Sequence, residues 1–116
     1  MSSITIYHNP RCTKSRKTLE LLKEKGFDPE VIEYLKNPPT PQQLMQILEK
    51  LGMNATQIIR TNEPKYAELN LFSSRVTEEG LIEYMCEFPI LIERPIVVHG
   101  DKAAIGRPPE NILAIL

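Results

Sequence analysis

The sequence predicts an α/β protein built on a four-stranded mixed sheet. Residues 4–34 follow the order strand, helix, strand, which is a βαβ unit with two parallel strands. Residues 94–116 follow the order strand, strand, helix. Between these units the apolar periodicity is helical. We therefore expect a single domain over residues 1–116, with a helical insertion over about residues 40–89.

Three short stretches predict the βαβ unit. Residues 4–7 alternate apolar and polar side chains as a half-buried strand does, and the pair Asn9-Pro10 ends that strand in a turn. A helical pattern follows over residues 13–25. Residues 30–34 are rich enough in apolar and β-branched side chains to form a second short strand.

The first helix of the insertion carries a complete start signal. Thr40 is a capping residue, Pro41 occupies the first helical position, and Gln43 completes a capping box. Gly52 is suited to end this helix. Three further helices are expected, over residues 54–60, 63–69 and 77–88, the last with Leu81, Tyr84, Met85 and Phe88 on its apolar face.

The C-terminal unit is predicted to begin with a β-hairpin. Residues 96–99 form one apolar strand, a Gly-Asp pair makes a tight turn, and residues 103–106 form the second strand. Two prolines then lead into a last helix over residues 111–116.

Cys12 falls in the loop that leads from the first strand into the first helix. Free main-chain N–H groups and the positive end of the helix dipole stabilise a thiolate at such a place. Arg11 adds positive charge, His8 stands at the strand end, and the Ser15 hydroxyl is placed to donate a hydrogen bond to the sulfur. These basic and polar neighbours favour a nucleophilic thiol over a packed, inert cysteine or an anion site without chemistry.

Composition limits the possible partners. The 116 residues are 41% hydrophobic and 25% charged, and a net charge of −1 gives no overall basic field for binding nucleic acid. Cys12 and Cys86 make no disulfide framework, and Cys86 is expected to be a packed, inert thiol. No metal motif, signal peptide or membrane-spanning run is evident. We expect a cytoplasmic monomer with no metal, no bound cofactor and no membrane partner.

The order of elements, with a cysteine at the start of the first helix and a proline before the hairpin, resembles the thioredoxin fold. More narrowly, the chain resembles the glutaredoxin-coupled arsenate reductase (ArsC) family over essentially its whole length. The residues that carry this resemblance are Tyr7-His8-Asn9-Pro10-Arg11-Cys12 with Ser15-Arg16, Tyr34-Leu35 with Asn37-Pro38-Pro39, Arg60, Arg94-Pro95-Ile96-Val97-Val98, and Arg107-Pro108-Pro109-Glu110.

The resemblance implies a role for four residues in handling an oxyanion. Cys12 matches the nucleophilic cysteine of the family. Arg60, Arg94 and Arg107 match the three arginines that hold the oxyanion. Arginine suits this task because its planar guanidinium donates two parallel hydrogen bonds and keeps its proton. The alternative for each arginine is a surface position beside a carboxylate partner.

The resemblance also implies supporting roles near the sulfur. His8 and Ser15 match residues that favour the thiolate, and Arg11 is an additional basic residue beside Cys12. The proline that matches Pro95 is usually cis in this fold, so we expect a cis bond there.

The implied activity is the reduction of arsenate to arsenite, an activity of arsenical resistance. The Cys12 thiolate attacks arsenic(V), glutathione acts as the co-substrate, and glutaredoxin resolves the mixed disulfide. The partners are needed because Ser15 stands where a C-x-x-C protein has its second thiol.

Three other functions share features with this sequence. A cysteine phosphatase needs an arginine six positions after the nucleophile, where this chain has Thr18, so that reading is set aside. A non-enzymatic transcription regulator of the Spx type, which binds RNA polymerase, shares the fold, but Ser15 replaces the second cysteine of its redox switch. A general monothiol–disulfide transferase acting on glutathione mixed disulfides stays open.

Overall fold

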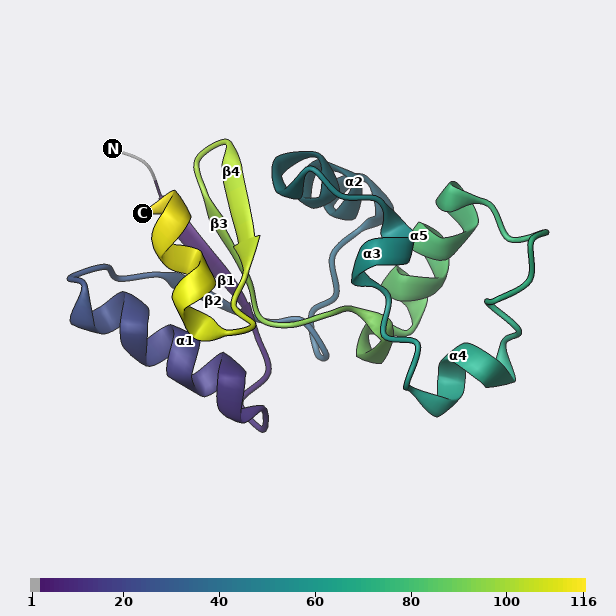
Figure 1. Cartoon of the computed structure of the whole chain (residues 1–116), viewed down its shortest axis with the longest axis horizontal. Helices are drawn as coiled ribbons and strands as arrows, with labels where there is room; N and C mark the ends of the chain where they lie inside the picture. The colour runs from purple at the N-terminus through teal and green to yellow at the C-terminus, as the bar shows by residue number, and fades with distance from the viewer. Residues whose placement is uncertain (1–2) are drawn as a thin grey trace. The chain divides into compact units, whose positions relative to one another are not determined.

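A computed structural model of the chain describes residues 3–116 (Figure 1). The chain divides into two compact units. The sheet unit comprises the chain up to Asn37 together with Arg94–Leu116, and the helical unit comprises Pro38–Glu93. The helical unit extends a few residues beyond each end of the predicted insertion of about 40–89.

The sheet unit contains a four-stranded mixed sheet, as the sequence predicts. Its strands are β1 (Ile4–His8), β2 (Glu30–Glu33), β3 (Ile96–His99) and β4 (Lys102–Ile105), in the order β2-β1-β3-β4. Strands β1 and β2 are parallel, whereas β1 with β3 and β3 with β4 are antiparallel. The predicted βαβ and ββ connections are therefore both confirmed.

Strand β1 alternates strictly between buried and half-buried side chains. Ile4, Ile6 and His8 are the buried set, and because successive side chains of a strand point to opposite faces, these three share one face of the sheet. The sequence predicts this strand only to Tyr7, whereas pairing with β2 continues to His8. His8 is therefore a strand residue that faces the same side as the apolar core.

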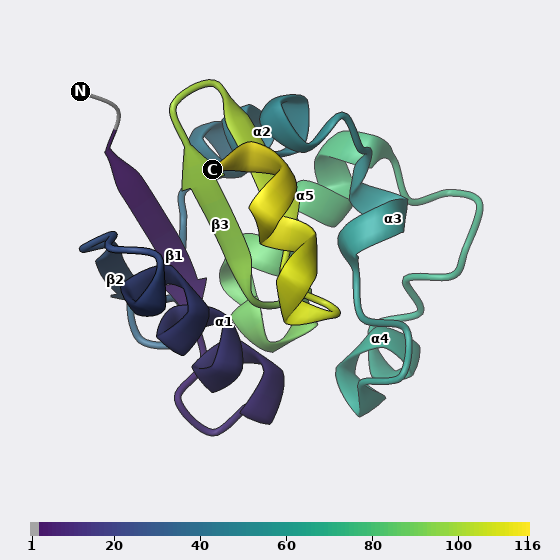
Figure 2. The ribbon, with the colours of Figure 1, turned by 60° about the vertical axis from the view of Figure 1, so that its left-hand side comes forward.

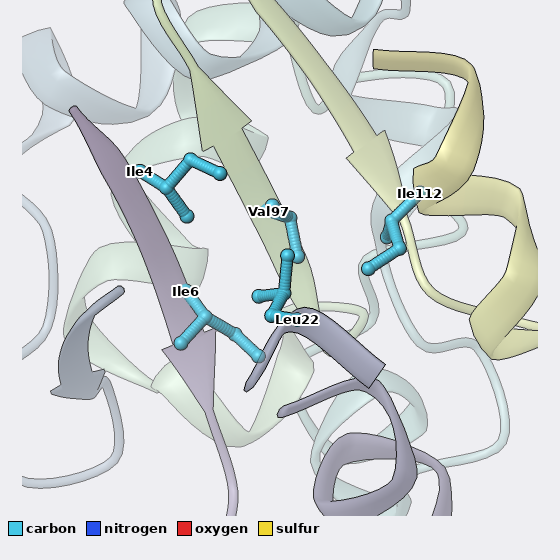
Figure 3. Packing of buried hydrophobic residues seen from close by; sticks show 5 residues of the cluster. All are labelled: Ile4, Ile6, Leu22, Val97 and Ile112. Carbon is cyan, nitrogen blue, oxygen red and sulfur yellow. The ribbon is translucent and has the colours of Figure 1, made fainter. Parts of the chain in front are cut away.

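Helix α1 (Thr13–Glu24) and the C-terminal segment η2 (Pro109–Ile115) cover that face of the sheet. Figures 1 and 2 show the two segments beside one another, and they contact each other. Their side chains Leu22 and Ile112 point toward the strands (Figure 3). The core cluster consists of Ile4, Ile6, Leu22, Val97 and Ile112.

The last element differs from the predicted helix over residues 111–116, because η2 is a 3₁₀ helix that begins at Pro109. The Asn111 N–H donates to the Pro108 carbonyl at 3.0 Å, which is the tighter three-residue spacing. Such short terminal segments take this form readily, and the two prolines at its start have no N–H groups to place in an α-helical ladder.

The helical unit begins with α2 (Pro41–Leu51), whose start is the predicted capping box. Thr40 accepts a hydrogen bond from the Gln43 N–H, and the Gln43 side chain accepts one from the Thr40 N–H. Gly52 ends α2 with φ of 68°, a conformation that favours glycine. The remaining helices are α3 (Ala55–Ile58), α4 (Pro64–Glu68), α5 (Glu78–Glu87) and the short 3₁₀ segment η1 (Pro89–Leu91).

Helix α5 buries a slightly different face from the predicted one. Leu81 and Met85 are buried as expected, but Ile82 is buried with them, whereas Tyr84 and Phe88 are only half-buried. Phe88 lies beyond the last helical residue, and its ring lies under the Lys65 ammonium group at 4.9 Å. Within residues 3–116, no helix is long and apolar enough to cross a membrane.

The core cluster predicts that two leucines of the sheet unit contribute very differently to the free energy of unfolding. Leu22 is fully buried, whereas Leu113 is exposed. We expect Leu22→Ala to lower the free energy of unfolding by about 2–5 kcal/mol, because it removes transfer energy and leaves a cavity. The matched Leu113→Ala change should cost only about 0.5 kcal/mol. Urea unfolding of both variants measures this, and equal losses would contradict the assigned core.

Candidate active site

Cys12 stands directly before the first residue of α1, at the N-cap position. Its N–H donates to the Asn9 carbonyl at 3.0 Å, which closes the turn that the Asn-Pro pair predicts. Its own carbonyl accepts from the Arg16 N–H at 3.0 Å, which is the first hydrogen bond of the helix. The half-buried Cys12 side chain therefore sits where the first main-chain N–H groups of α1 have no partner within the helix.

The surroundings of the sulfur lower the pKa of the Cys12 thiol below its ordinary value. Burial is the largest single influence and by itself raises the pKa, but the other influences together outweigh it. The main-chain N–H groups of Ser15 and Lys14 donate hydrogen bonds to the sulfur, and the charges of Arg94 and Arg107 stabilise the thiolate. The thiol is thus shifted toward its nucleophilic form.

Ser15 supports the sulfur in a different way from the one the sequence suggests. Its hydroxyl lies 2.7 Å from His8 Nδ1 and accepts a hydrogen bond from the Asn9 N–H at 3.0 Å. The side chain is completely buried. The main chain of Ser15, not its hydroxyl, supplies the hydrogen bond that lowers the pKa of Cys12, while the hydroxyl ties the end of β1 to the first turn of α1.

The surroundings of His8 favour its neutral form, because they lower the pKa of the imidazole. Burial is the main influence that lowers the pKa of the imidazole, and the charges of Arg16 and Lys23 act in the same direction against an opposing effect of Glu33. A neutral imidazole carries no net charge to attract the thiolate. The contribution of His8 to the site is therefore the hydrogen bond to Ser15, which fixes the loop around Cys12.

Arg11 and Arg16 lie close to Cys12 in sequence, and both form hydrogen bonds with the turn before α1. Arg16 donates to the Pro10 carbonyl at 2.8 Å and to the Thr13 hydroxyl at 3.2 Å, so it braces the turn. Arg11 is exposed, and its main-chain N–H donates to Asn9 Oδ1 at 3.0 Å. Neither guanidinium is among the charges that lower the pKa of Cys12.

Arg94 and Arg107 come from the C-terminal part of the chain and reach the same end of the sheet as Cys12, because β3 begins beside the end of β1. Arg107 Nη1 lies 4.0 Å from Cys12 Sγ. Arg94 directly precedes β3, and its bond to Pro95 is cis, as the resemblance led us to expect. The bond between Arg107 and Pro108 is also cis.

Arg60, the third arginine expected to hold an oxyanion, belongs to the helical unit. Its guanidinium is hydrogen-bonded to Glu63, and its Nε lies 4.0 Å from Glu93 Oε1. Its N–H donates to the Leu91 carbonyl at 2.8 Å. The structure thus assembles Cys12 with Arg94 and Arg107 in one unit, and gives Arg60 carboxylate neighbours in the other.

Cys86 also lies in the helical unit, on α5. Burial is the main cause that raises the pKa of its thiol to about 11, and Glu83 adds to the effect. A thiol with so high a pKa is a weak nucleophile at neutral pH. Within residues 3–116, no group of three or more His, Cys, Asp or Glu side chains could hold a metal ion.

Asn9 forms the predicted turn with both its side chain and its main chain. Three residues have roles that the sequence did not predict: Lys14, Thr18 and Gly106. Lys14 donates its N–H to the sulfur, and its place in the first turn of a helix that begins beside a cysteine is a signal that could have identified it. Thr18 and Gly106 pack against each other beneath the site, and no pattern in the sequence pairs them.

The contact between Arg107 and the sulfur predicts that Arg107 affects the alkylation rate of Cys12 more than Arg11 does. Arg107→Ala should raise the pKa of Cys12 and slow its alkylation by iodoacetamide several-fold at neutral pH, because it removes one charge that stabilises the thiolate. Arg11→Ala should change the rate little, since Arg11 is exposed to solvent. Alkylation rates measured across pH test this, and a larger effect from Arg11 would overturn the assignment.

The chain is similar to a known protein family along almost its whole length. The model of the ArsC family matches residues 7–115. The chain is 54% identical over 114 residues to "Uncharacterized protein YfgD" of Escherichia coli (strain K12), covering 97% of this chain and 96% of that protein. It is 43% identical over 116 residues to an arsenate reductase of the same organism, covering 100% of this chain and 82% of that protein.

A solved structure shows the same fold. The arsenate reductase from Vibrio cholerae superposes with a TM-score of 0.96 at 46% sequence identity, over 99% of this chain and 98% of that one. The predicted thioredoxin-like fold is confirmed by this match and by the sheet order. With a family model that spans almost the whole sequence and relatives that align along its length, the chain belongs to the ArsC family.

Proposed function

We propose that the protein is an oxidoreductase that reduces arsenate to arsenite at Cys12, with glutathione and glutaredoxin as electron donors. The observation that carries the proposal is the sulfur of Cys12, which has a lowered pKa and lies 4.0 Å from the Arg107 guanidinium. An activated thiolate beside a cation is equipped to attract and attack an oxyanion. The arsenate reductases among the relatives support the choice of substrate.

The first step is nucleophilic substitution at arsenic. The Cys12 thiolate forms a sulfur–arsenic bond, an arsenic–oxygen bond breaks, and the oxygen leaves as water or hydroxide. Arsenic stays in its +5 state. Arg94 and Arg107 hold the remaining oxygens and offset the negative charge that builds in the transition state. We assign the same role to Arg60 on the resemblance to the family.

The second step reduces arsenic. The thiolate of glutathione attacks the Cys12 sulfur, so that a sulfur–sulfur bond forms and the sulfur–arsenic bond breaks. The electron pair of the broken bond stays on arsenic, which leaves as arsenite in its +3 state. Cys12 remains as a mixed disulfide with glutathione.

The third step restores the enzyme with an outside thiol. A glutaredoxin thiolate attacks the glutathione sulfur, and the Cys12 thiolate leaves. An outside thiol suits this site because position 15 carries a serine whose hydroxyl is engaged with His8 and Asn9. The lowered pKa of Cys12 also makes it a good leaving group. The resolving step therefore draws on the same surroundings as the attack.

The decisive test is a coupled assay with the purified protein, arsenate, glutathione and glutaredoxin. Loss of NADPH through glutathione reductase reports turnover. We expect turnover that depends on arsenate and disappears in Cys12→Ser, because the hydroxyl is not ionised at neutral pH. Cys86→Ser is the matched control and should keep the activity, since the pKa of Cys86 is raised to about 11.

Other outcomes would redirect the proposal. Arsenate reduction retained in Cys12→Ser would refute the mechanism. Turnover on a glutathionylated peptide that exceeds turnover on arsenate would assign the site to a general monothiol–disulfide transferase. Co-purification with RNA polymerase, without turnover on either substrate, would favour the regulator.

The pH dependence of the first step follows from the lowered pKa of Cys12. Below that pKa the thiol is protonated and inert, so the rate of arsenate reduction should fall as the pH drops through it. The acidic limb of kcat/KM should coincide with the alkylation titration of Cys12. In Arg107→Ala both curves should shift together to higher pH. A limb that does not move with the thiol would mean that another group limits the rate.

A further inference from the structure

Thr18 connects the helix that presents Cys12 to the loop that presents Arg107. It lies on α1 and is completely buried. Its hydroxyl donates to the Lys14 carbonyl at 2.8 Å and lies 3.4 Å from the Gly106 carbonyl oxygen. Lys14 in turn supplies one of the N–H groups that stabilise the sulfur. The Thr18 hydroxyl thus lies close both to the first turn of α1 and to the residue that precedes Arg107.

Gly106 is pressed against Thr18 so closely that no side chain fits between them. A Cβ atom at this position would lie 2.5 Å from Thr18 Oγ1 and 2.9 Å from Thr18 Cγ2. It would also lie 2.9 Å from Pro95 Cγ. These separations are well below van der Waals contact, so even one methyl group would force the segments apart.

The contact involves the sequence neighbours of both arginines of the site. Gly106 directly precedes Arg107, and Pro95 directly follows Arg94. The Gly106 N–H donates to the Pro95 carbonyl at 3.0 Å, which ties the two segments together. Helix α1, the segment before β3 and the segment after β4 therefore meet at this contact. Each of the three also carries a group that lowers the pKa of Cys12: the first main-chain N–H groups of α1, Arg94 and Arg107.

We propose that Gly106 and Thr18 are positioning residues that set the distance between the Arg107 guanidinium and the Cys12 sulfur through this close contact. Neither residue is among the groups that shift the pKa of Cys12 directly. Gly106 lets the Arg107 segment approach α1, and Thr18 supplies the surface against which it stops. The consequence of this contact for arsenate turnover rests on the proposed function. Its effect on the Cys12 thiol does not depend on arsenate.

The arrangement gives a physical meaning to Thr18 at the sixth position after the nucleophile. In a cysteine phosphatase this position carries the arginine that binds the oxyanion. In this chain the sixth position carries the small buried Thr18, and the cation near the sulfur is Arg107, which belongs to a segment distant in sequence. Such a site must fix the distance between two separate segments, and a contact without room for a side chain does so.

The test measures the alkylation of Cys12 by iodoacetamide across pH in Gly106→Ala, Thr18→Ala and the double variant. Gly106→Ala should raise the pKa of Cys12 and slow alkylation at neutral pH several-fold, because the inserted methyl group moves Arg107 away from the sulfur. In the double variant two of the three close approaches disappear, since Thr18 Oγ1 and Cγ2 are absent. It should recover part of the lost rate, a non-additive effect of neighbours.

A control separates positioning from a general loss of stability. Ile4→Val removes one methyl group from the core of the same unit and should leave the alkylation curve of Cys12 unchanged. If Gly106→Ala does not fold, Thr18→Ala alone still tests the proposal. It opens space beside Gly106 and should raise the pKa of Cys12, whereas Thr18→Ser, which keeps the hydroxyl, should change it less.

Three results would overturn the proposal. The first is a Gly106→Ala variant that folds and keeps the Cys12 pKa of the unaltered protein. The second is an Ile4→Val variant whose Cys12 pKa shifts as much as that of Gly106→Ala. The third is a double variant whose alkylation rate is no closer to that of the unaltered protein than the rate of Gly106→Ala. The proposed function fails separately, because a shifted thiol pKa in a protein that never turns over arsenate would leave the positioning contact intact.

Discussion

The packing of α1 against the buried face of β1 is the constraint on which the site depends. Leu22 meets Ile4 and Ile6 in the core, so the helix runs back along the strand and its first turn lies beside the strand's end. The first N–H groups of any helix need partners outside it. Here the sulfur of Cys12 accepts from two of them, and apolar burial near one end of α1 thereby creates an acidic thiol at the other.

Two cationic side chains, Arg94 and Arg107, act on the Cys12 sulfur. Each charge favours the thiolate over the neutral thiol, and together with the main-chain N–H groups of Lys14 and Ser15 they outweigh the effect of burial on the pKa. In the proposed reaction the same two guanidinium groups would also hold the oxygens of the oxyanion.

The sequence was sufficient for the features that local chemistry decides. The parallel pair of the βαβ unit, the β-hairpin, the capping box at Thr40 and the position of Cys12 at the start of α1 all follow from periodicity and turn residues. The order of the strands in the sheet does not. The partners of Ser15 could not be predicted, since its hydroxyl and its N–H face different neighbours once the helix has formed. The contact of Thr18 with Gly106 joins residues far apart in sequence, and only tertiary packing reveals it. The surroundings of Arg60 depend likewise on the pairing of two segments of the helical unit.

The environments of the two cysteines push their acidities in opposite directions. Burial and a neighbouring carboxylate make Cys86 a poor acid, whereas main-chain donors and arginines make Cys12 a good one. An electrophile or oxidant at neutral pH selects between thiols by their ionised fraction. We therefore expect such a reagent to modify Cys12 before Cys86, although the chain contains both thiols. That order would let a fluorophore or a crosslinker be attached at Cys12 of the native chain without first mutating Cys86.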